Sequence, residues 1–198
     1  MRYRSYQTAD NLILAIVAVN LVLFIATLVV NGDRKLIDIL GLTPAEWTAE
    51  PWTILTSVFM HASIWHILMN MLALYFLGRF LCILIGEKWF SIIFLVGGLM
   101  GSFFCILFST FLDTGWITVI GSSGAVFAIA GALVLLAPQM RVLLFFMIPM
   151  PLWVAIIGGF IIISFLPGVA WQAHLGGLVT GLAAGYYLRK RGPRRIIF

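Results

Sequence analysis

Long uncharged apolar stretches alternate with short polar segments along the whole chain. A run of about 20 apolar residues crosses the roughly 30 Å hydrocarbon core of a bilayer as one helix. The pattern predicts six such spans: between Asp10 and Asp33, from His61 to Leu77 with an end at Arg79, between Lys88 and Asp113, from Gly121 to Pro138, from Val142 to the break at Leu166-Pro167-Gly168, and from Trp171 to Leu188. The predicted fold is therefore a six-transmembrane-helix bundle.

Composition supports this pattern, because 63% of the residues are hydrophobic, 10% are charged and the mean hydropathy is +1.12. Such a chain is too apolar for a water-soluble domain, and we expect residues 1–198 to form a single all-α transmembrane domain in contact with membrane lipids. Cys82 and Cys105 lie within apolar stretches and indicate neither a disulfide framework nor a metal site. The pI of about 9.6 predicts no nucleic-acid partner, because the basic residues flank the spans and form no single face.

The basic residues predict the orientation of the bundle, since Lys and Arg accumulate on the cytoplasmic side of a membrane. Six spans place both termini on one side, which holds Arg2, Arg4, Arg79, Lys88, Arg141, Arg189, Lys190, Arg191, Arg194 and Arg195. The opposite side holds only Arg34 and Lys35. We therefore expect a multi-pass protein of the cell membrane with cytoplasmic N- and C-termini.

The polar interval after the first span is predicted to contain a short helix. Thr43-Pro44-Ala45-Glu46 has the form of a capping box with proline at the first helical position. Apolar residues surround it, Trp47 and Trp52 among them. We expect this loop to lie partly in the membrane interface.

Polar residues gather at the first residues of predicted spans two, four and six. These spans all run from outside to inside, so their N-terminal ends share the outer half of the membrane. The set includes every histidine of the chain: His61, His66 and Asn70, then Ser122 and Ser123, then Gln172 and His174. Polar side chains within a span are costly and usually face the bundle interior or a water-filled cavity. The convergence indicates a functional site that opens toward the extracytoplasmic side.

Simpler interpretations exist for these residues. The stretch Gly121-Ser122-Ser123-Gly124 suits a helix cap and a packing contact, since serine is a common N-cap and glycine is ordinary at membrane helix contacts. A metal site made by the histidines is disfavoured, because His61 and His66 lie about 140° apart on a helix and no acidic residue is near them in the sequence. A His-lined transporter would more often carry a mid-span carboxylate. We expect neither a metal nor another cofactor.

A hydrolytic interpretation gives each polar group a role. Ser123 would be the nucleophile and His174 the general base, as a dyad, because no carboxylate is placed to orient the imidazole. His66 and Asn70 are four residues apart and share one helix face, so both could join the Ser123 N–H in stabilising an oxyanion. Small residues, Gly124 and Ala128 on span four and Gly177, Gly181 and Gly185 on span six, would let these two helices approach closely.

Assembled in this way, the chain resembles the rhomboid intramembrane serine proteases. The family's GxSG motif is matched by Gly121-Ser122-Ser123-Gly124, which selects Ser123 over Ser122. Its AHxxGxxxG motif is matched from Ala173 and His174 to Gly177 and then Gly181, and its HxxxxHxxxN motif by His61, His66 and Asn70. The resemblance covers nearly the whole chain.

The resemblance implies a prokaryotic, minimal six-helix form with a Ser123–His174 dyad. It assigns the oxyanion contacts to His66, Asn70 and the Ser123 N–H, and supporting roles to Gly121, Gly124, His61, Gly177 and Gly181. Phe127 takes the place of the ring, commonly tyrosine, that stacks on the catalytic histidine. The implied activity is cleavage of transmembrane segments of other membrane proteins. The alternatives are an inactive relative that binds membrane clients and, less favoured, a transporter.

Overall fold

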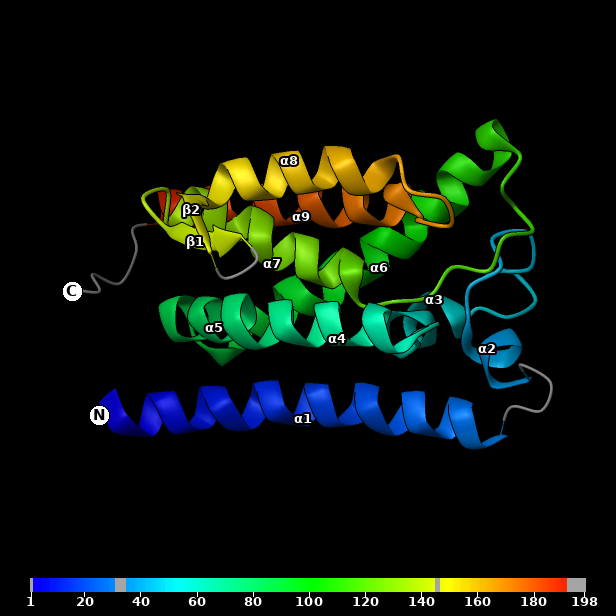
Figure 1. Cartoon of the computed structure of the whole chain (residues 1–198), viewed down its shortest axis with the longest axis horizontal. Helices are drawn as coiled ribbons and strands as arrows, with labels where there is room; N and C mark the ends of the chain where they lie inside the picture. Colours follow the sequence, from blue (N-terminus) through cyan, green and yellow to red (C-terminus); the bar gives the residue numbers. More distant parts are fainter. Residues whose placement is uncertain (1, 31–34, 145–146, 192–198) are drawn as a thin grey trace.

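The computed structural model describes residues 2–30, 35–144 and 147–191 as a bundle of helices with one short hairpin (Figure 1). In chain order the elements are α1 (Arg2–Val30), α2 (Lys35–Leu40), α3 (Thr53–Thr56), the 3₁₀ turn η1 (Ser57–Phe59), α4 (Ile64–Ala73), the π-helical turn η2 (Leu74–Gly78), α5 (Arg79–Ile85), α6 (Glu87–Leu112), α7 (Ser123–Leu136), β1 (Arg141–Leu144), β2 (Ile148–Pro151), α8 (Leu152–Ser164) and α9 (Trp171–Lys190). Figure 1 shows that α1 begins and α9 ends at one end of the bundle, here called the terminal end. The opposite end, where α4, α7 and α9 begin, is called the site end.

Each predicted span contains a helix or consecutive helices, although the bounds of the second and fifth spans differ from those predicted. Among the described residues, three helical segments are long and apolar enough to cross a membrane: Gln7–Val30, Ile64–Ile85 and Glu87–Leu112. The helices α7 and α8 are apolar but shorter. The mostly helical fold and the membrane-spanning character are thus present, while the count of six spans stays a prediction.

The second span is longer than predicted, because α4, η2 and α5 follow one another without a break as far as Ile85. The prediction that it ends at Arg79 is wrong. The Arg79 guanidinium forms an ion pair with Asp10 of α1, and its Nη2 donates to Asp10 Oδ2 at 3.2 Å. A charge satisfied by a neighbouring helix does not have to end a helix at the membrane surface.

The helix predicted to begin at the Thr43 capping box does not form, and residues 44–49 make turns. The backbone of this loop bonds instead to the segment before α7: Leu42 and Val119 exchange two backbone hydrogen bonds of 3.0 and 2.7 Å, and Ala45 N–H donates to the Gly115 carbonyl at 2.8 Å. The Thr43 hydroxyl bonds the Thr118 hydroxyl at 3.0 Å. These tertiary bonds replace the local ones that the capping box would have provided.

A short antiparallel hairpin separates α7 from α8, where the sequence predicts a continuous fifth span from Val142. In it Arg141 pairs with Pro151 and Leu143 with Pro149, and α8 begins only at Leu152. The all-α prediction is therefore wrong at this one place. The uncharged run after Arg141 was predicted to be helical, but an apolar run by itself does not distinguish a strand from a helix.

The helix α7 occupies the centre of the bundle and packs against α4, α6, α8 and α9. Ala125, Ala128, Ile129, Ala132 and Leu133 are completely buried there. Because most of these side chains are small, neighbouring backbones come close to the start of α7, where the candidate residues lie.

Candidate functional site

The structure brings Ser123 and His174 together across the interface between α7 and α9. His174 Nε2 and Ser123 Oγ lie 2.8 Å apart, within hydrogen-bond distance. Ser123 opens α7 and is partly exposed, whereas His174 lies in the first turn of α9 and is 7% exposed. The imidazole is thus held in the bundle while the hydroxyl can be reached, which is the arrangement that a nucleophile and its base require.

The neighbouring Ser122 has different surroundings. It is fully buried, and its Oγ lies 3.4 Å from His61 Nε2. Ser122 occupies the N-cap position of α7, yet its side chain makes no capping hydrogen bond. The simple interpretation of a serine cap therefore fails at this position, and of the two serines only Ser123 contacts His174.

Gly121 holds the chain against His66. Its φ of +129° is a conformation that side-chain-bearing residues rarely adopt, and a Cβ built there would lie 2.7 Å from His66 Nε2 and 3.8 Å from Ser123 Oγ. The Gly121 N–H donates to the Ser57 carbonyl at 2.9 Å, a bond with no side-chain signal that could be found in the sequence. Because Gly121 has no side chain, the His66 ring can lie in the space close to the Ser123 hydroxyl.

Asn70 lies one turn beyond His66 on α4 and is 6% exposed. Its Nδ2 donates to the His66 carbonyl at 2.9 Å. An amide group carries two N–H donors, so this bond leaves a second donor for another acceptor. The ring of His61 packs edge-on against the ring of His66, with centroids 5.0 Å apart. His61 and Asn70 thus contact His66 from within the same segment of chain.

An aromatic ring covers one face of the His174 imidazole. The rings of Phe127 and His174 are stacked, with centroids 4.6 Å apart and planes 24° from parallel. Among the described residues, His174 Nδ1 is buried without a hydrogen-bond partner. In a serine–histidine–aspartate triad a carboxylate fixes the imidazole through this nitrogen. Here the stacked ring and the bond to Ser123 are the contacts that hold it.

Glycines set the distance between the two helices. A Cβ built on Gly177 would overlap the Gly124 carbonyl group, and one on Gly181 would overlap the Ala128 carbonyl group. A Cβ on Gly124 would in turn lie 3.2 Å from the Ala173 carbonyl oxygen, next to His174. The backbones of α7 and α9 are in direct contact at these positions, so the separation of Ser123 from His174 is fixed by main chain.

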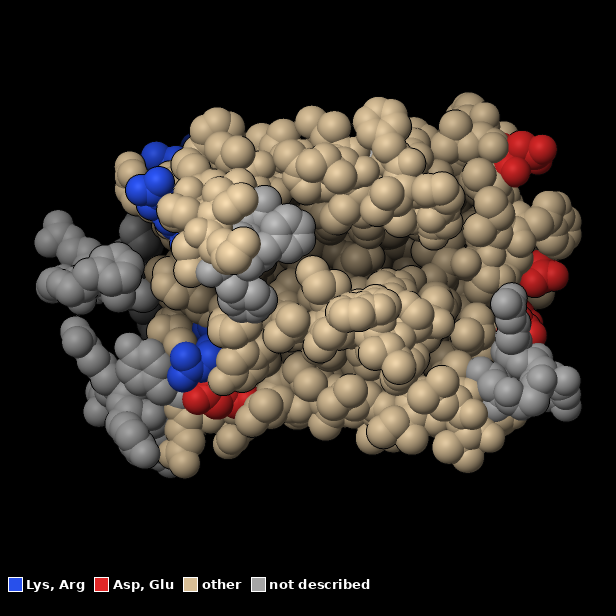
Figure 2. All heavy atoms as spheres, in the orientation of Figure 1, with Lys and Arg blue, Asp and Glu red and all other residues tan. Residues whose placement is uncertain are grey.

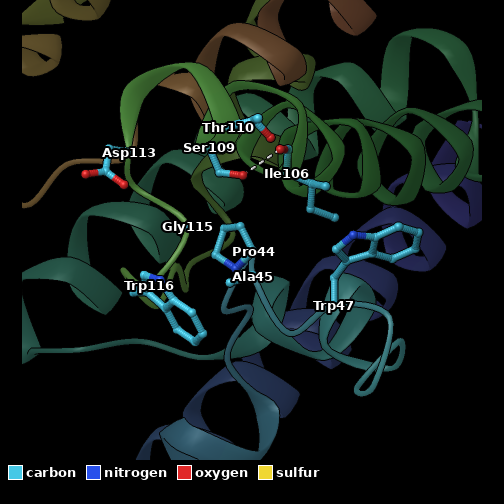
Figure 3. A pocket seen from close by; sticks show the side chains of 9 residues that line it. All are labelled: Pro44, Ala45, Trp47, Ile106, Ser109, Thr110, Asp113, Gly115 and Trp116. Atoms are coloured by element: carbon cyan, nitrogen blue, oxygen red, sulfur yellow. Dashed lines mark hydrogen bonds between the residues drawn. The ribbon is translucent and has the colours of Figure 1, made fainter.

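A separate pocket of about 260 Å³ lies at the site end, between the first loop and the end of α6 (Figure 3). Pro44, Ala45 and Trp47 line one side of it, and Ser109, Thr110 and Gly115 line the other. Figure 3 shows the Ser109 hydroxyl directed to the Ile106 carbonyl, a bond of 2.7 Å. None of the sequence-predicted site residues lines this pocket. In the described part of the chain, no three His, Cys, Asp or Glu residues are grouped so as to hold a metal ion.

The fold and the site define a helical membrane protein that carries a hydrogen-bonded serine–histidine pair between two of its helices. Residues 48–191 match the family model of the rhomboid domain, and the chain belongs to the rhomboid family. The resemblance seen in the motifs is thereby confirmed.

Three relatives show the range of the family. The chain is 30% identical over 165 residues to the mitochondrial rhomboid protein 1 of Saccharomyces cerevisiae, covering 75% of this chain and 45% of that protein. It is 30% identical over 153 residues to the rhomboid protease GluP of Bacillus subtilis, covering 76% and 28%. It is 29% identical over 132 residues to the inactive RHOMBOID-like protein 8 of Arabidopsis thaliana, covering 66% and 36%. The chain thus spans less than half the length of each of these relatives.

Proposed function

We propose that the protein is an intramembrane serine endopeptidase that cleaves transmembrane segments of other membrane proteins with a Ser123–His174 dyad. The observation that carries this proposal is the 2.8 Å contact between Ser123 Oγ and His174 Nε2. Membership of a family that includes a protease supports it. No cofactor is required for this chemistry.

In the first step, Ser123 Oγ attacks the carbonyl carbon of the scissile peptide bond while His174 Nε2 takes the hydroxyl proton. The tetrahedral intermediate collapses, His174 returns the proton to the leaving amine, and the C–N bond breaks to leave an ester on Ser123. Water then attacks this ester as His174 Nε2 takes one of its protons, and the bond between the acyl carbon and Ser123 Oγ breaks as His174 returns the proton to Oγ, which releases the acid product and restores the serine hydroxyl. For Nε2 to accept a proton, the single proton of the neutral ring must reside on Nδ1, the nitrogen that has no acceptor among the described residues.

In this proposal three hydrogen-bond donors stabilise the oxyanion: the Ser123 N–H at the start of α7, the His66 ring and the Asn70 side-chain amide. The Ser123 N–H belongs to the first turn of a helix, where backbone donors lack intrahelical partners. The closeness of His66 to the space beside Gly121 and the second amide hydrogen of Asn70 support the other two assignments. Each such donor is typically worth a hundredfold or more in rate (about 10²–10³).

We further propose that residues 1–198 form a single transmembrane domain of six spans in the cell membrane, with residues 1 and 198 on the cytoplasmic side. The site would then open on the extracytoplasmic side. Figure 2 supports this orientation, since the visible Lys and Arg side chains lie at the terminal end, together with one acidic patch, and the other acidic patches of this face lie at the site end. Among the described residues, Asp38, Glu46 and Glu50 belong to the first loop, on the side opposite the basic ones.

We propose that α8 moves to let the substrate reach the Ser123–His174 pair. A Cβ built on Gly158 or Gly159 would meet no atom within 4 Å, in contrast to the glycines of α9. Four large side chains of α8 are exposed: Trp153, Ile157, Ile161 and Ile162. A weakly packed helix can move at lower cost than the tightly packed α7 and α9. Cross-linking α8 to α4 should therefore block cleavage, and full activity of the cross-linked protein would contradict this assignment.

The proposal is tested by reconstituting the protein with a labelled transmembrane substrate. Ser123→Ala and His174→Ala should each abolish cleavage, whereas Ser122→Ala should retain it, because Ser122 contacts His61 and not His174. Thermal unfolding shows that each variant is folded. Cleavage by folded Ser123→Ala protein would refute the dyad.

The alternative is a client-binding protein without catalytic activity, which the similarity to an inactive relative keeps open. Labelling with a serine-reactive fluorophosphonate separates the two functions. A reactive enzyme should be labelled in the wild type and in Ser122→Ala, but not in Ser123→Ala. Absence of labelling in the folded wild type, together with binding of an intact transmembrane peptide, would favour the client-binding function.

A further inference from the structure

The hairpin between α7 and α8 lies at the terminal end of the bundle (Figure 1) and exposes apolar side chains. Leu143 is 57% exposed, Ile148 is 52% exposed, and Met147 beside the turn is 77% exposed. The hairpin joins the end of α7 to the start of α8, the two helices proposed above as the fourth and fifth spans, so in that arrangement it lies at the depth where hydrocarbon gives way to headgroups. Exposure of these apolar side chains to water is unfavourable, whereas their contact with lipid at the membrane interface is favourable.

The backbone of the hairpin suits the headgroup region better than the hydrocarbon core. An isolated two-stranded sheet has two open edges, and unpaired N–H and C=O groups are not tolerated in hydrocarbon. In β2, Pro149 lies opposite Leu143 and Pro151 lies opposite Arg141. Proline has no N–H, so the backbone hydrogen bonds between the two strands are formed by the residue pairs that alternate with these two. The two prolines therefore face the open edge, where they remove the N–H donors and leave only carbonyl acceptors.

A pocket of about 280 Å³ lies beside the base of this hairpin. It is lined by Pro138, Gln139, Arg141, Pro151 and Trp153. The guanidinium of Arg141 has no acidic neighbour in this lining, in contrast to Arg79, which is paired with Asp10. A guanidinium with no acidic residue in its pocket lining, next to an amide side chain and an indole, is a set of donors suited to a phosphate oxygen, since arginine binds phosphate through parallel N–H bonds.

We propose that the hairpin and this pocket form a binding site for an anionic phospholipid. Arg141 and Gln139 bind the headgroup phosphate, and the indole of Trp153 lies at the level of the glycerol ester groups, where tryptophan is favoured. Leu143, Met147 and Ile148 contact the acyl chains of the same leaflet. This site does not depend on the Ser123–His174 chemistry, and its occupant is a lipid of the surrounding membrane.

Native mass spectrometry of the detergent-purified full chain tests this site. The protein is mixed with equal amounts of phosphatidylglycerol and phosphatidylcholine of matched acyl chains, and the ratio of the two bound lipids is measured. The wild type should prefer phosphatidylglycerol, and Arg141→Gln should lower the ratio about fivefold, the usual effect of one basic residue at a membrane surface. Lys88→Gln is the matched control, because Lys88 is exposed at the same end of the bundle but does not line the pocket, and it should leave most of the preference in place.

Fluorescence of the unaltered protein provides a second readout. Brominated phosphatidylglycerol should quench tryptophan emission more than brominated phosphatidylcholine, and Trp153→Phe should remove most of this difference. Three results would overturn the proposal: equal retention of the two lipids by the wild type, equal losses in Arg141→Gln and Lys88→Gln, or full competition by glycerol phosphate without acyl chains. The last result would identify a site for a free phosphate compound and exclude a lipid site.

Discussion

Replacement of Gly177 by alanine tests whether close backbone contact positions the Ser123–His174 pair. A Cβ on Gly177 would lie 2.7 Å from the Gly124 carbonyl carbon, while ordinary van der Waals contact begins at 3.4 Å. The Gly124 carbonyl oxygen would overlap this Cβ more closely still, so the two helices would have to separate by more than about 0.7 Å to accept one methyl group. Gly177 lies one turn beyond His174, and Gly124 follows Ser123 directly, so this displacement acts on the two reacting side chains.

The expected effect on catalysis is larger than the effect on stability. Overpacking of this kind costs about 1–3 kcal/mol, and the higher helix propensity of alanine offsets about 1 kcal/mol of that cost. A misplacement near 1 Å reduces the rate of an enzyme about a hundredfold. Gly177→Ala should therefore remain folded in detergent while its kcat/KM for a transmembrane substrate falls by about two orders of magnitude.

Gly158→Ala is the matched control, because the same substitution in α8 adds a methyl group that meets no atom within 4 Å. It should cleave at the wild-type rate and unfold at the same or a slightly higher temperature. Rates are measured in proteoliposomes with a fluorescently labelled transmembrane peptide, and stability is measured by thermal unfolding. If folded Gly177→Ala protein cleaves as fast as Gly158→Ala protein, the main-chain contact does not set the geometry of the dyad.

Two further predictions concern the surroundings of the dyad. Gly121→Ala should abolish cleavage and cost about 1–3 kcal/mol of stability, because its positive φ and the nearby His66 ring both oppose a Cβ. Gly86 also has a positive φ but lies in open space, so Gly86→Ala should lose stability in thermal unfolding and keep its cleavage activity. Phe127→Leu should lower kcat about fivefold, because it removes a stacking contact worth about 1 kcal/mol. Phe127→Tyr keeps the aromatic ring and should keep the wild-type kcat. Equal kcat values for the two variants would show that the ring does not hold His174.

The sequence predicted the helical segments well because their signals are local. Uncharged apolar runs define membrane helices, and the glycine spacing on α9 predicted a close approach to α7. The meeting of Ser123 with His174 followed from the alternating direction of the spans together with the family motifs. These inferences required only the order of segments along the chain.

The sequence did not predict the features that depend on distant partners. No helix begins at the Thr43 capping box, because the backbone there bonds to the segment before α7. The second span continues past Arg79, because Asp10 neutralises the Arg79 charge. The contact between the Gly121 N–H and the Ser57 carbonyl joins two main-chain groups, which leave no trace in side-chain identity. Each of these outcomes was decided by a neighbour in space whose identity the local pattern does not encode.

The π-helical turn η2 gives the second span two separate registers. A π turn closes through i→i+5 bonds and holds about one residue more than an α turn, so the side chains beyond it are rotated by roughly 100° relative to an unbroken α-helix. On one side of this turn α4 places the His66 ring beside Gly121, and on the other side α5 directs Arg79 toward Asp10 of α1. One continuous helical segment thereby contacts the candidate site with one face and α1 with another, and the single extra residue of the π turn sets the angle between these two faces.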